Sequence, residues 1–213
     1  MKTRMLLATV FMLATLSCMG QQLMYANLND LIEGRADTVS TLRVLRRSKR
    51  QIYTLGGADY RIVADENSGL SRYLRSRCYA VNIEGQLYVN CKKMRYGKYR
   101  FGHWYAPAVA IGGRFFFQAQ PLGQLASSSL VPVDAVRLGG EFGNAIAVSS
   151  LVNDRVYYEI NPETGRSEFL GKERMHELLS DYPDKQAELL EEPTEAAAVM
   201  MKYLFFLSRQ ARE

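Results

Sequence analysis

The chain has 213 residues, of which 47% are hydrophobic, 11% aromatic and 23% charged, and its formal net charge is +5 at pH 7. This composition is typical of a globular protein with a sizeable core, and it excludes wholesale disorder, a collagen and a polytopic membrane protein. The length fits one domain, alone or with an appendage, and not two large domains.

The first 20 residues have the pattern of a secretory signal peptide. Lys2 and Arg4 form a short positive region, residues 5–16 form an apolar run too short to span a bilayer, and Gly20 is small enough for a signal peptidase. Cleavage at that point leaves a chain that begins at Gln21. We therefore expect an exported protein, located in the periplasm, at the outer membrane or outside the cell.

Cys18 leaves a second route to the envelope open, because a bacterial lipoprotein is acylated on such a cysteine. Three residues before it stands Thr15, where a lipoprotein signal has leucine, so we favour removal of Cys18 with the signal. No later apolar run reaches about 18 residues, and we expect no transmembrane helix after cleavage.

Residues 21–76 carry mixed signals. Residues 23–32 are compatible with a helix, and residues 38–45 favour a strand. Two short β-favouring runs, 52–55 and 60–63, flank a Gly-Gly-Ala-Asp turn and predict a hairpin. Residues 65–69 predict a loop.

Two further β-favouring runs, residues 77–83 and 86–91, are separated by Glu84 and Gly85, the length of a two-residue hairpin loop. Pairing Ile83 with Gln86 places Cys78 opposite Cys91 at a non-hydrogen-bonded position, whose short Cα separation suits a disulfide. Because export favours oxidation, we predict a Cys78–Cys91 disulfide.

Three alternatives to this disulfide stay open. Glu84 disfavours a positive φ, and a three-residue loop would move the two cysteines out of register. Both residues could instead be buried free thiols. A catalytic cysteine is the third alternative, but its only candidate bases are His103 and His176, and neither has a recognisable partner.

Basic and aromatic residues alternate directly after this hairpin, and they form our candidate binding site. If the segment is a strand, alternation places the charges on one sheet face and the rings on the other. Such a face suits a polyanion, for example the phosphates of lipopolysaccharide or an acidic glycan. An outward basic face over an aromatic core, met by the protein's own acidic tail, explains the same pattern. The candidate residues are Lys92, Lys93, Arg95, Lys98, Tyr99, Arg100 and Trp104.

The overall charge distribution supports this choice of site. Residues 21–152 contain 17 Lys and Arg against 9 Asp and Glu, whereas residues 153–213 contain 8 against 13. A second basic group precedes the candidate site in the sequence and comprises Arg43, Arg46, Arg47, Lys49 and Arg50.

The rest of the chain predicts hairpins followed by helices. Residues 108–111 and 114–118 close around Gly112-Gly113, and residues 156–160 and 167–170 close around an Asn-Pro-Glu-Thr-Gly turn. From residue 172 the period becomes helical, with two short helices and a longer one that we expect Thr194 to cap. The longer helix carries one apolar stripe, formed by Ala196, Met200, Tyr203, Leu204 and Leu207.

Two patterns imitate functional motifs. Residues 136–147 resemble a dinucleotide-binding turn followed at the right distance by Glu159, but the first glycines are adjacent and hairpins surround the segment. A small-residue helix face made by Gly139, Gly143 and Ala147 explains it better. Ser127–Ser129, with His103 as a possible base, imitate a serine hydrolase site but lack the nucleophile elbow of such enzymes. We therefore expect no catalytic constellation, no nucleotide or other cofactor, and no metal site.

Together these elements predict an α+β protein: an antiparallel sheet or partly open barrel built from hairpins, with C-terminal helices packed on it. The expected organisation is a signal peptide at 1–20, a mainly β domain at 21–171 and a helical segment at 172–213.

Three stretches resemble secreted proteins of unknown function from Bacteroidota: the signal peptide, residues 87–102 (LYVNCKKMRYGKYRFG), and the 161–165 turn followed by residues 178–183 (LLSDYP). The resemblance implies an envelope location and carries over no functional residues. We expect a non-enzymatic binding or accessory module for an anionic ligand. The alternative is a structural component whose C-terminal helices contact other envelope proteins, and a hydrolase is a third class without a nameable nucleophile.

Overall fold

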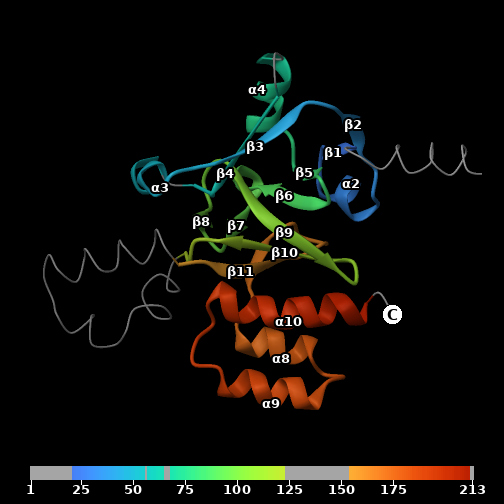
Figure 1. Ribbon diagram of the computed structural model, residues 1–213, viewed down its shortest axis with the longest axis vertical. Helices are drawn as coiled ribbons and strands as arrows, with labels where there is room; N and C mark the ends of the chain where they lie inside the picture. The colour runs from blue at the N-terminus through green and yellow to red at the C-terminus, as the bar shows by residue number, and fades with distance from the viewer. Residues whose placement is uncertain (1–20, 56, 65–67, 123–153, 212–213) are drawn as a thin grey trace, which may run out of the picture.

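The computed structural model describes residues 21–55, 57–64, 68–122 and 154–211. The protein has an α+β fold in which a large, open antiparallel sheet lies on a stack of C-terminal helices (Figure 1). This confirms the predicted fold class, and of the two predicted forms the sheet is the correct one, since the strands do not close into a barrel.

The main sheet has 10 strands in the order β12-β11-β10-β9-β6-β5-β1-β2, while β4 branches off by pairing with both β3 and β9. A separate sheet consists of β7 and β8. The strands are β1 Gln22–Tyr25, β2 Asp37–Val39, β3 Leu42–Arg46, β4 Tyr60–Ala64, β5 Ala80–Ile83, β6 Gln86–Asn90, β7 Arg95–Tyr96, β8 Tyr99–Arg100, β9 Tyr105–Ile111, β10 Arg114–Ala119, β11 Val156–Ile160 and β12 Ser167–Phe169. The helices are α2 Leu28–Ile32, α3 Lys49–Leu55, α4 Ser68–Ser76, the 3-10 helix η1 Cys91–Lys93, α8 Lys172–Leu178, α9 Pro183–Glu191 and α10 Ala197–Gln210.

Three of the four predicted hairpins are confirmed. β9 and β10 pair around Gly112-Gly113, and β11 pairs with β12. In the β5–β6 hairpin, Ile83 pairs with Gln86 as predicted, and both Glu84 (φ 54°) and Gly85 (φ 81°) adopt positive φ. Positive φ at both central residues is what the tight two-residue turn requires, so the twist of the strands overrides the preference of Glu84.

Predictions for residues 21–76 are partly wrong. Residues 23–32 divide into β1 and α2, and residues 52–55 belong to α3, so the hairpin predicted there does not exist and β4 pairs with β3. The cause is a capping box: Gln51 N donates to Ser48 Oγ, and Ser48 N donates to Gln51 Oε1. Helix α4 had no predicted counterpart, and it begins inside the span predicted as a loop.

The three C-terminal helices are confirmed, but the predicted cap of the last one is wrong. α10 begins at Ala197 with Ala196 as its N-cap, and Ala197 N donates to the carbonyl of Arg155 at 2.7 Å. The helix start is thus fixed by the chain before β11 and not by Thr194. The predicted stripe is correct, because Met200, Tyr203 and Leu204 are buried against the sheet.

Three hydrophobic clusters form the core. One lies between the C-terminal helices and the sheet and includes Phe116, Tyr157 and Met175. A second covers the other side of the central strands and includes Phe117 and Tyr158. The third lies where α4 covers β4 and β5 and includes Leu74 and Val81.

The predicted disulfide is not formed, because Cys78 and Cys91 are buried free thiols in two different clusters. The strand alternation breaks between Tyr79 and Ala80, which both lie in the second cluster, so that Cys78 lies in the third. Cys78 N donates to the carbonyl of Tyr73 at the end of α4, away from the β5–β6 ladder. The register prediction is therefore correct, but the break in alternation places the two cysteines in different clusters.

The buried thiols predict a simple chemical result. Burial raises the pKa of Cys78 to about 11 and raises that of Cys91 further, which suppresses the reactive thiolate. We expect no reaction of either cysteine with an aromatic disulfide reagent at neutral pH, and two reactive thiols per chain 21–213 after denaturation without reductant. Their absence after denaturation would show that the two cysteines are cross-linked.

Candidate anion-binding surface

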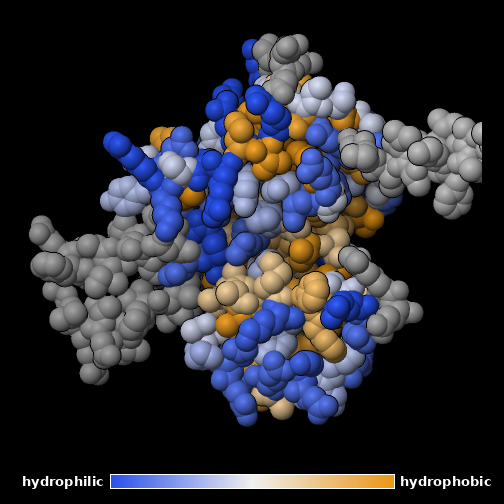
Figure 2. Space-filling view, viewed as in Figure 1, coloured by the Kyte–Doolittle hydropathy of each residue, from blue (hydrophilic) through white to orange (hydrophobic). Residues whose placement is uncertain are grey.

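The structure gathers most of the predicted site on one small exposed hairpin. Lys92 and Lys93 lie in η1, Arg95 in β7, Lys98 in the following turn and Arg100 in β8, and all five side chains are exposed. We call these five residues the basic hairpin. Figure 2 shows hydrophilic residues gathered on this side of the sheet, beside α3 and β8.

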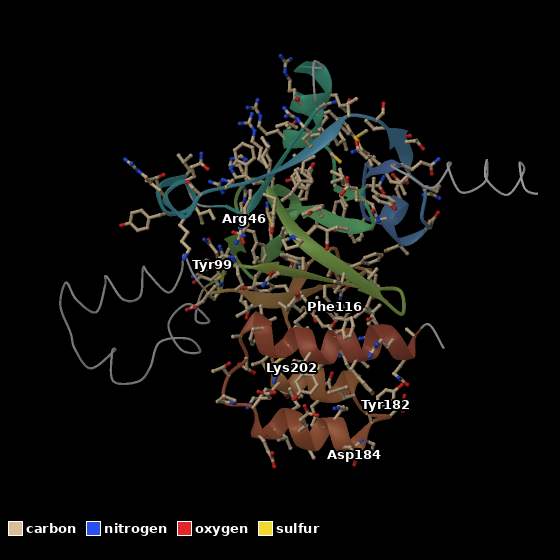
Figure 3. All side chains as sticks on the ribbon, in the orientation of Figure 1. Arg46, Tyr99, Phe116, Tyr182, Asp184 and Lys202 are labelled. Carbon is tan, nitrogen blue, oxygen red and sulfur yellow. The ribbon has the colours of Figure 1, made fainter. Side chains whose placement is uncertain are left out.

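The predicted separation of charges and rings onto two faces is wrong in detail. β8 has two residues, and both Tyr99 and Arg100 are exposed, while Phe101 is buried. The side chains of Arg46 and Tyr99 lie on the same side of the molecule (Figure 3). The aromatic residues that anchor the hairpin to the core are therefore Tyr96 and Phe101, and Tyr99 belongs to the surface.

Aromatic contacts hold the basic hairpin against the sheet. The ring of Tyr158 in β11 lies 5.4 Å from that of Tyr96 and 4.7 Å from that of Phe101, both edge to face. Phe101 also contacts Phe117 at 5.1 Å, and Met94 is fully buried. Edge-to-face packing is the favourable geometry for such rings, so the hairpin has a defined position.

The basic hairpin brings like charges close together, and the described residues supply no ion-pair partner for them. Arg95 and Arg100 are directly opposite each other in the β7–β8 ladder, and like charges in that position are destabilising. Lys98 lies 5.5 Å from the centre of the Tyr99 ring. Among the residues that the structure describes, no carboxylate forms an ion pair with any of these five side chains.

The acidic C-terminal helices do not neutralise this surface. Glu159 is buried between Arg114 (3.2 Å) and Arg174 (2.9 Å), and Arg174 also pairs with Glu177. Two further pairs, Lys185–Glu188 and Lys202–Glu192, lie within the helical segment. Glu177, Glu188 and Glu192 therefore pair within the helical segment, and Glu159 joins that segment to Arg114 of β10 rather than to the basic hairpin.

Trp104 lies between β8 and β9 with its backbone at φ 81°, a conformation that a bulky residue rarely adopts. Close backbone packing imposes it: Cys91 N donates to the Trp104 carbonyl at 2.8 Å, and a Cβ at Gly57 would meet the His103 carbonyl oxygen at 2.4 Å. The guanidinium carbons of Arg47 and Arg61 each lie 5.4 Å from the centre of the indole ring.

A pocket of about 230 Å³ lies beside this ring, between α4 and β4. We call it the arginine pocket. Its lining residues are Arg61, Ile62, Val63, Ser71, Arg72, Arg75 and Trp104.

The three arginines of this pocket were not predicted as site residues. The three-residue spacing of Arg72 and Arg75 indicates that both lie on one face of a helix, but only if a helix is predicted at residues 68–76. Arg61 carries no such signal, because its neighbours in the pocket come from other parts of the chain.

The second expected function, through the C-terminal helices, has its own surface. A groove of about 550 Å³ runs between α10, α2 and strands β5, β6 and β9, with Phe205 (59% exposed) and Met201 (42% exposed) along it. Phe116, labelled in Figure 3, points from β10 toward α10. The Gly139, Gly143 and Ala147 face, the dinucleotide-like segment and Ser127–Ser129 lie outside the described residues.

The two candidate catalytic bases and the possible metal ligands can be located in the described part of the chain. No three His, Cys, Asp or Glu side chains of the described residues come together as potential metal ligands. Gln186 Nε2 forms hydrogen bonds with the ring Nδ1 and the carbonyl of His176, and His103 is exposed. None of the helices within 21–55, 57–64, 68–122 and 154–211 is long and apolar enough to cross a bilayer.

Comparison with known proteins identifies a family. The model of a family described as "Family of unknown function (DUF6563)" matches residues 23–211. No curated protein and no solved structure matches the chain. The resemblance to a family of unknown function is confirmed in this coarser form, and its secreted, Bacteroidota character stays a prediction.

Proposed function

Because the chain belongs to DUF6563, a family of unknown function, we propose its function from its surface: it is an exported, non-enzymatic module that binds an anionic ligand through the basic hairpin. The ligand class is a polyanion of the cell envelope, such as phosphorylated lipopolysaccharide or an acidic glycan. The signal-peptide pattern of residues 1–20 supports export, with removal of the signal favoured over acylation of Cys18.

One observation carries this proposal. The fold aligns Arg95 directly opposite Arg100, adds Lys92, Lys93 and Lys98 around them, and supplies no described carboxylate to any of the five. Such an arrangement is unfavourable in the isolated protein and becomes favourable when an anion with several charges lies along it. Tyr99, exposed beside these charges, offers a ring surface to a sugar or a base.

The proposal predicts salt-dependent retention on heparin. A variant with Lys92, Lys93, Lys98 and Arg100 changed to Gln should elute at much lower salt than the wild type, because each lost contact releases about one counterion fewer. The matched control changes Arg166, Lys185, Lys202 and Arg209 to Gln, which removes the same charge from the other half of the protein. We expect the control to elute close to the wild type.

Co-elution of the wild type and the basic-hairpin variant at low salt would overturn the proposal, since the hairpin would then be an ordinary solvated surface. In that case the apolar groove beside α10 supports the second candidate, a structural component that contacts other proteins. Association that survives high salt and is lost in Phe205→Ser would identify that function.

A further inference from the structure

The arginine pocket is built on a rigid frame. Ser71 Oγ bonds both the N–H and the carbonyl of Ala64 at 3.2 Å, which fixes the middle of α4 to the end of β4. The carbonyl of Leu74 accepts hydrogen bonds from Asn90 Nδ2 (3.0 Å) and the Tyr105 hydroxyl (2.8 Å), which fixes the end of α4 to the central sheet. The helix that carries Arg72 and Arg75 therefore has one defined position.

Three arginines line this pocket, and none of its described lining residues is acidic. Arg72 and Arg75 are three residues apart on α4, so they project on the same side of the helix. Arg61 reaches the pocket from β4, and its guanidinium lies 5.4 Å from the centre of the Trp104 ring, which orients it. Nitrogen-tipped side chains gather beside α4 in Figure 3.

The size of the pocket limits its ligand. At about 230 Å³ it is smaller than the roughly 300–1,000 Å³ of sites for drug-sized molecules. It therefore suits one compact anionic group rather than a long chain segment.

The donor geometry distinguishes between anions. A carboxylate has two oxygens and satisfies one guanidinium fork well, whereas a phosphate monoester offers three terminal oxygens and up to two negative charges. Three arginines thus match three phosphate oxygens. We propose that the arginine pocket, formed by Arg61, Arg72, Arg75 and Trp104, binds the phosphate of a phosphomonoester, such as a phosphorylated sugar or a lipid headgroup.

This inference deepens the proposed function and rests on it for the nature of the ligand. The two surfaces are connected through Trp104, whose carbonyl accepts a hydrogen bond from Cys91 N, directly before Lys92 of the basic hairpin. The basic hairpin collects polyanions by charge, and the arginine pocket selects those that carry a terminal phosphate.

Trp104 is the single tryptophan of the chain, so the pocket has a built-in probe. Inorganic phosphate, glycerol phosphate, sodium acetate and sodium chloride are titrated into the purified protein at constant ionic strength, with Trp104 fluorescence and its indole N–H resonance as readouts. We expect saturable changes with the two phosphates and none with acetate or chloride. Vesicles of phosphatidylcholine, with and without phosphatidic acid, test whether a headgroup phosphate is accepted as well.

The decisive variant is Arg72→Gln with Arg75→Gln, compared with Arg166→Gln with Arg209→Gln as a control of equal charge outside both surfaces. The first should raise the dissociation constant for glycerol phosphate by about tenfold or more, because it removes charge-assisted hydrogen bonds, and the second should leave it nearly unchanged. Arg61→Lys keeps the charge but loses the fork, and it should also weaken binding.

An equal response to acetate and phosphate, or equal phosphate binding by both double variants, would overturn the inference. If heparin retention depends on the basic hairpin but phosphate gives no saturable response, the inference fails and the proposed function stands. If phosphate binds in the pocket but the hairpin variant keeps its heparin retention, the proposed function fails and the site stands. Unchanged thermal unfolding of each variant verifies that the changes in binding are local.

Discussion

Asn90→Asp is expected to lower the free energy of unfolding by about 4 kcal/mol, because it places a carboxylate where a buried amide donates two hydrogen bonds. Asn90 is fully buried. Its Nδ2 donates to the carbonyls of Leu74 (3.0 Å) and Cys78 (2.9 Å), and its Oδ1 accepts from Lys92 N (3.1 Å). This one amide joins the end of α4, the approach to β5 and the start of η1.

Urea unfolding followed by circular dichroism measures this loss. Asn82→Asp makes the same chemical change at a half-buried position of β5 and should cost about 0.5 kcal/mol. Equal stability of Asn90→Asp and the wild type would mean that the amide does not make these bonds in solution.

Tyr158→Ala is expected to destabilise the protein by about 4 kcal/mol and also to weaken heparin retention. The buried ring contacts those of Tyr96, Phe101 and Phe117, so its removal leaves a cavity under the basic hairpin. The hairpin then loses its anchor, and its charges become spread over many conformations.

Tyr158→Phe separates the two effects. It keeps the ring but loses the hydroxyl, which donates to the Gln120 carbonyl and accepts from Leu122 N. We expect a loss of about 1 kcal/mol and unchanged retention. Unchanged retention in folded Tyr158→Ala would show that polyanion binding does not depend on the position of the hairpin.

Turn residues and hydrophobic periodicity correctly predicted the elements that form between residues close together in the sequence. The β9–β10 hairpin, the β11–β12 hairpin and the register of β5–β6 follow from turn residues and alternation, which act over a few neighbouring residues. The C-terminal helices follow from their period for the same reason. The pairings β3–β4 and β1–β5 have no such local signal, since the former spans a helix and the latter joins distant segments.

One short stretch, residues 48–55, accounts for a larger difference between the predicted and the observed fold. The Ser48–Gln51 capping box converts a β-favouring run into α3, and β4 then pairs with β3 on its earlier side. The predicted disulfide is not formed because the strand alternation breaks between Tyr79 and Ala80, whereas the prediction assumed regular alternation up to Cys78. Both errors arise from one side-chain interaction or one backbone irregularity. The predictions rest on periodic patterns that extend over several residues and do not register such single features.

The candidate site likewise has one part that the sequence predicts and one part that it does not. The basic hairpin could be predicted, because its residues are consecutive in the sequence. The arginine pocket could not, since Arg61, Arg72 and Trp104 become neighbours only when α4 packs on β4 and the backbone of Trp104 enters the left-handed region.

The left-handed backbone of Trp104 combines a strained conformation with the contacts that its ring makes. Glycine adopts φ 81° without strain, whereas a bulky side chain costs roughly 1–2 kcal/mol in that region. The indole also packs against the core, so glycine at position 104 would relieve the backbone strain but remove that packing. A version of this protein with glycine there would also lose the ring that orients Arg61.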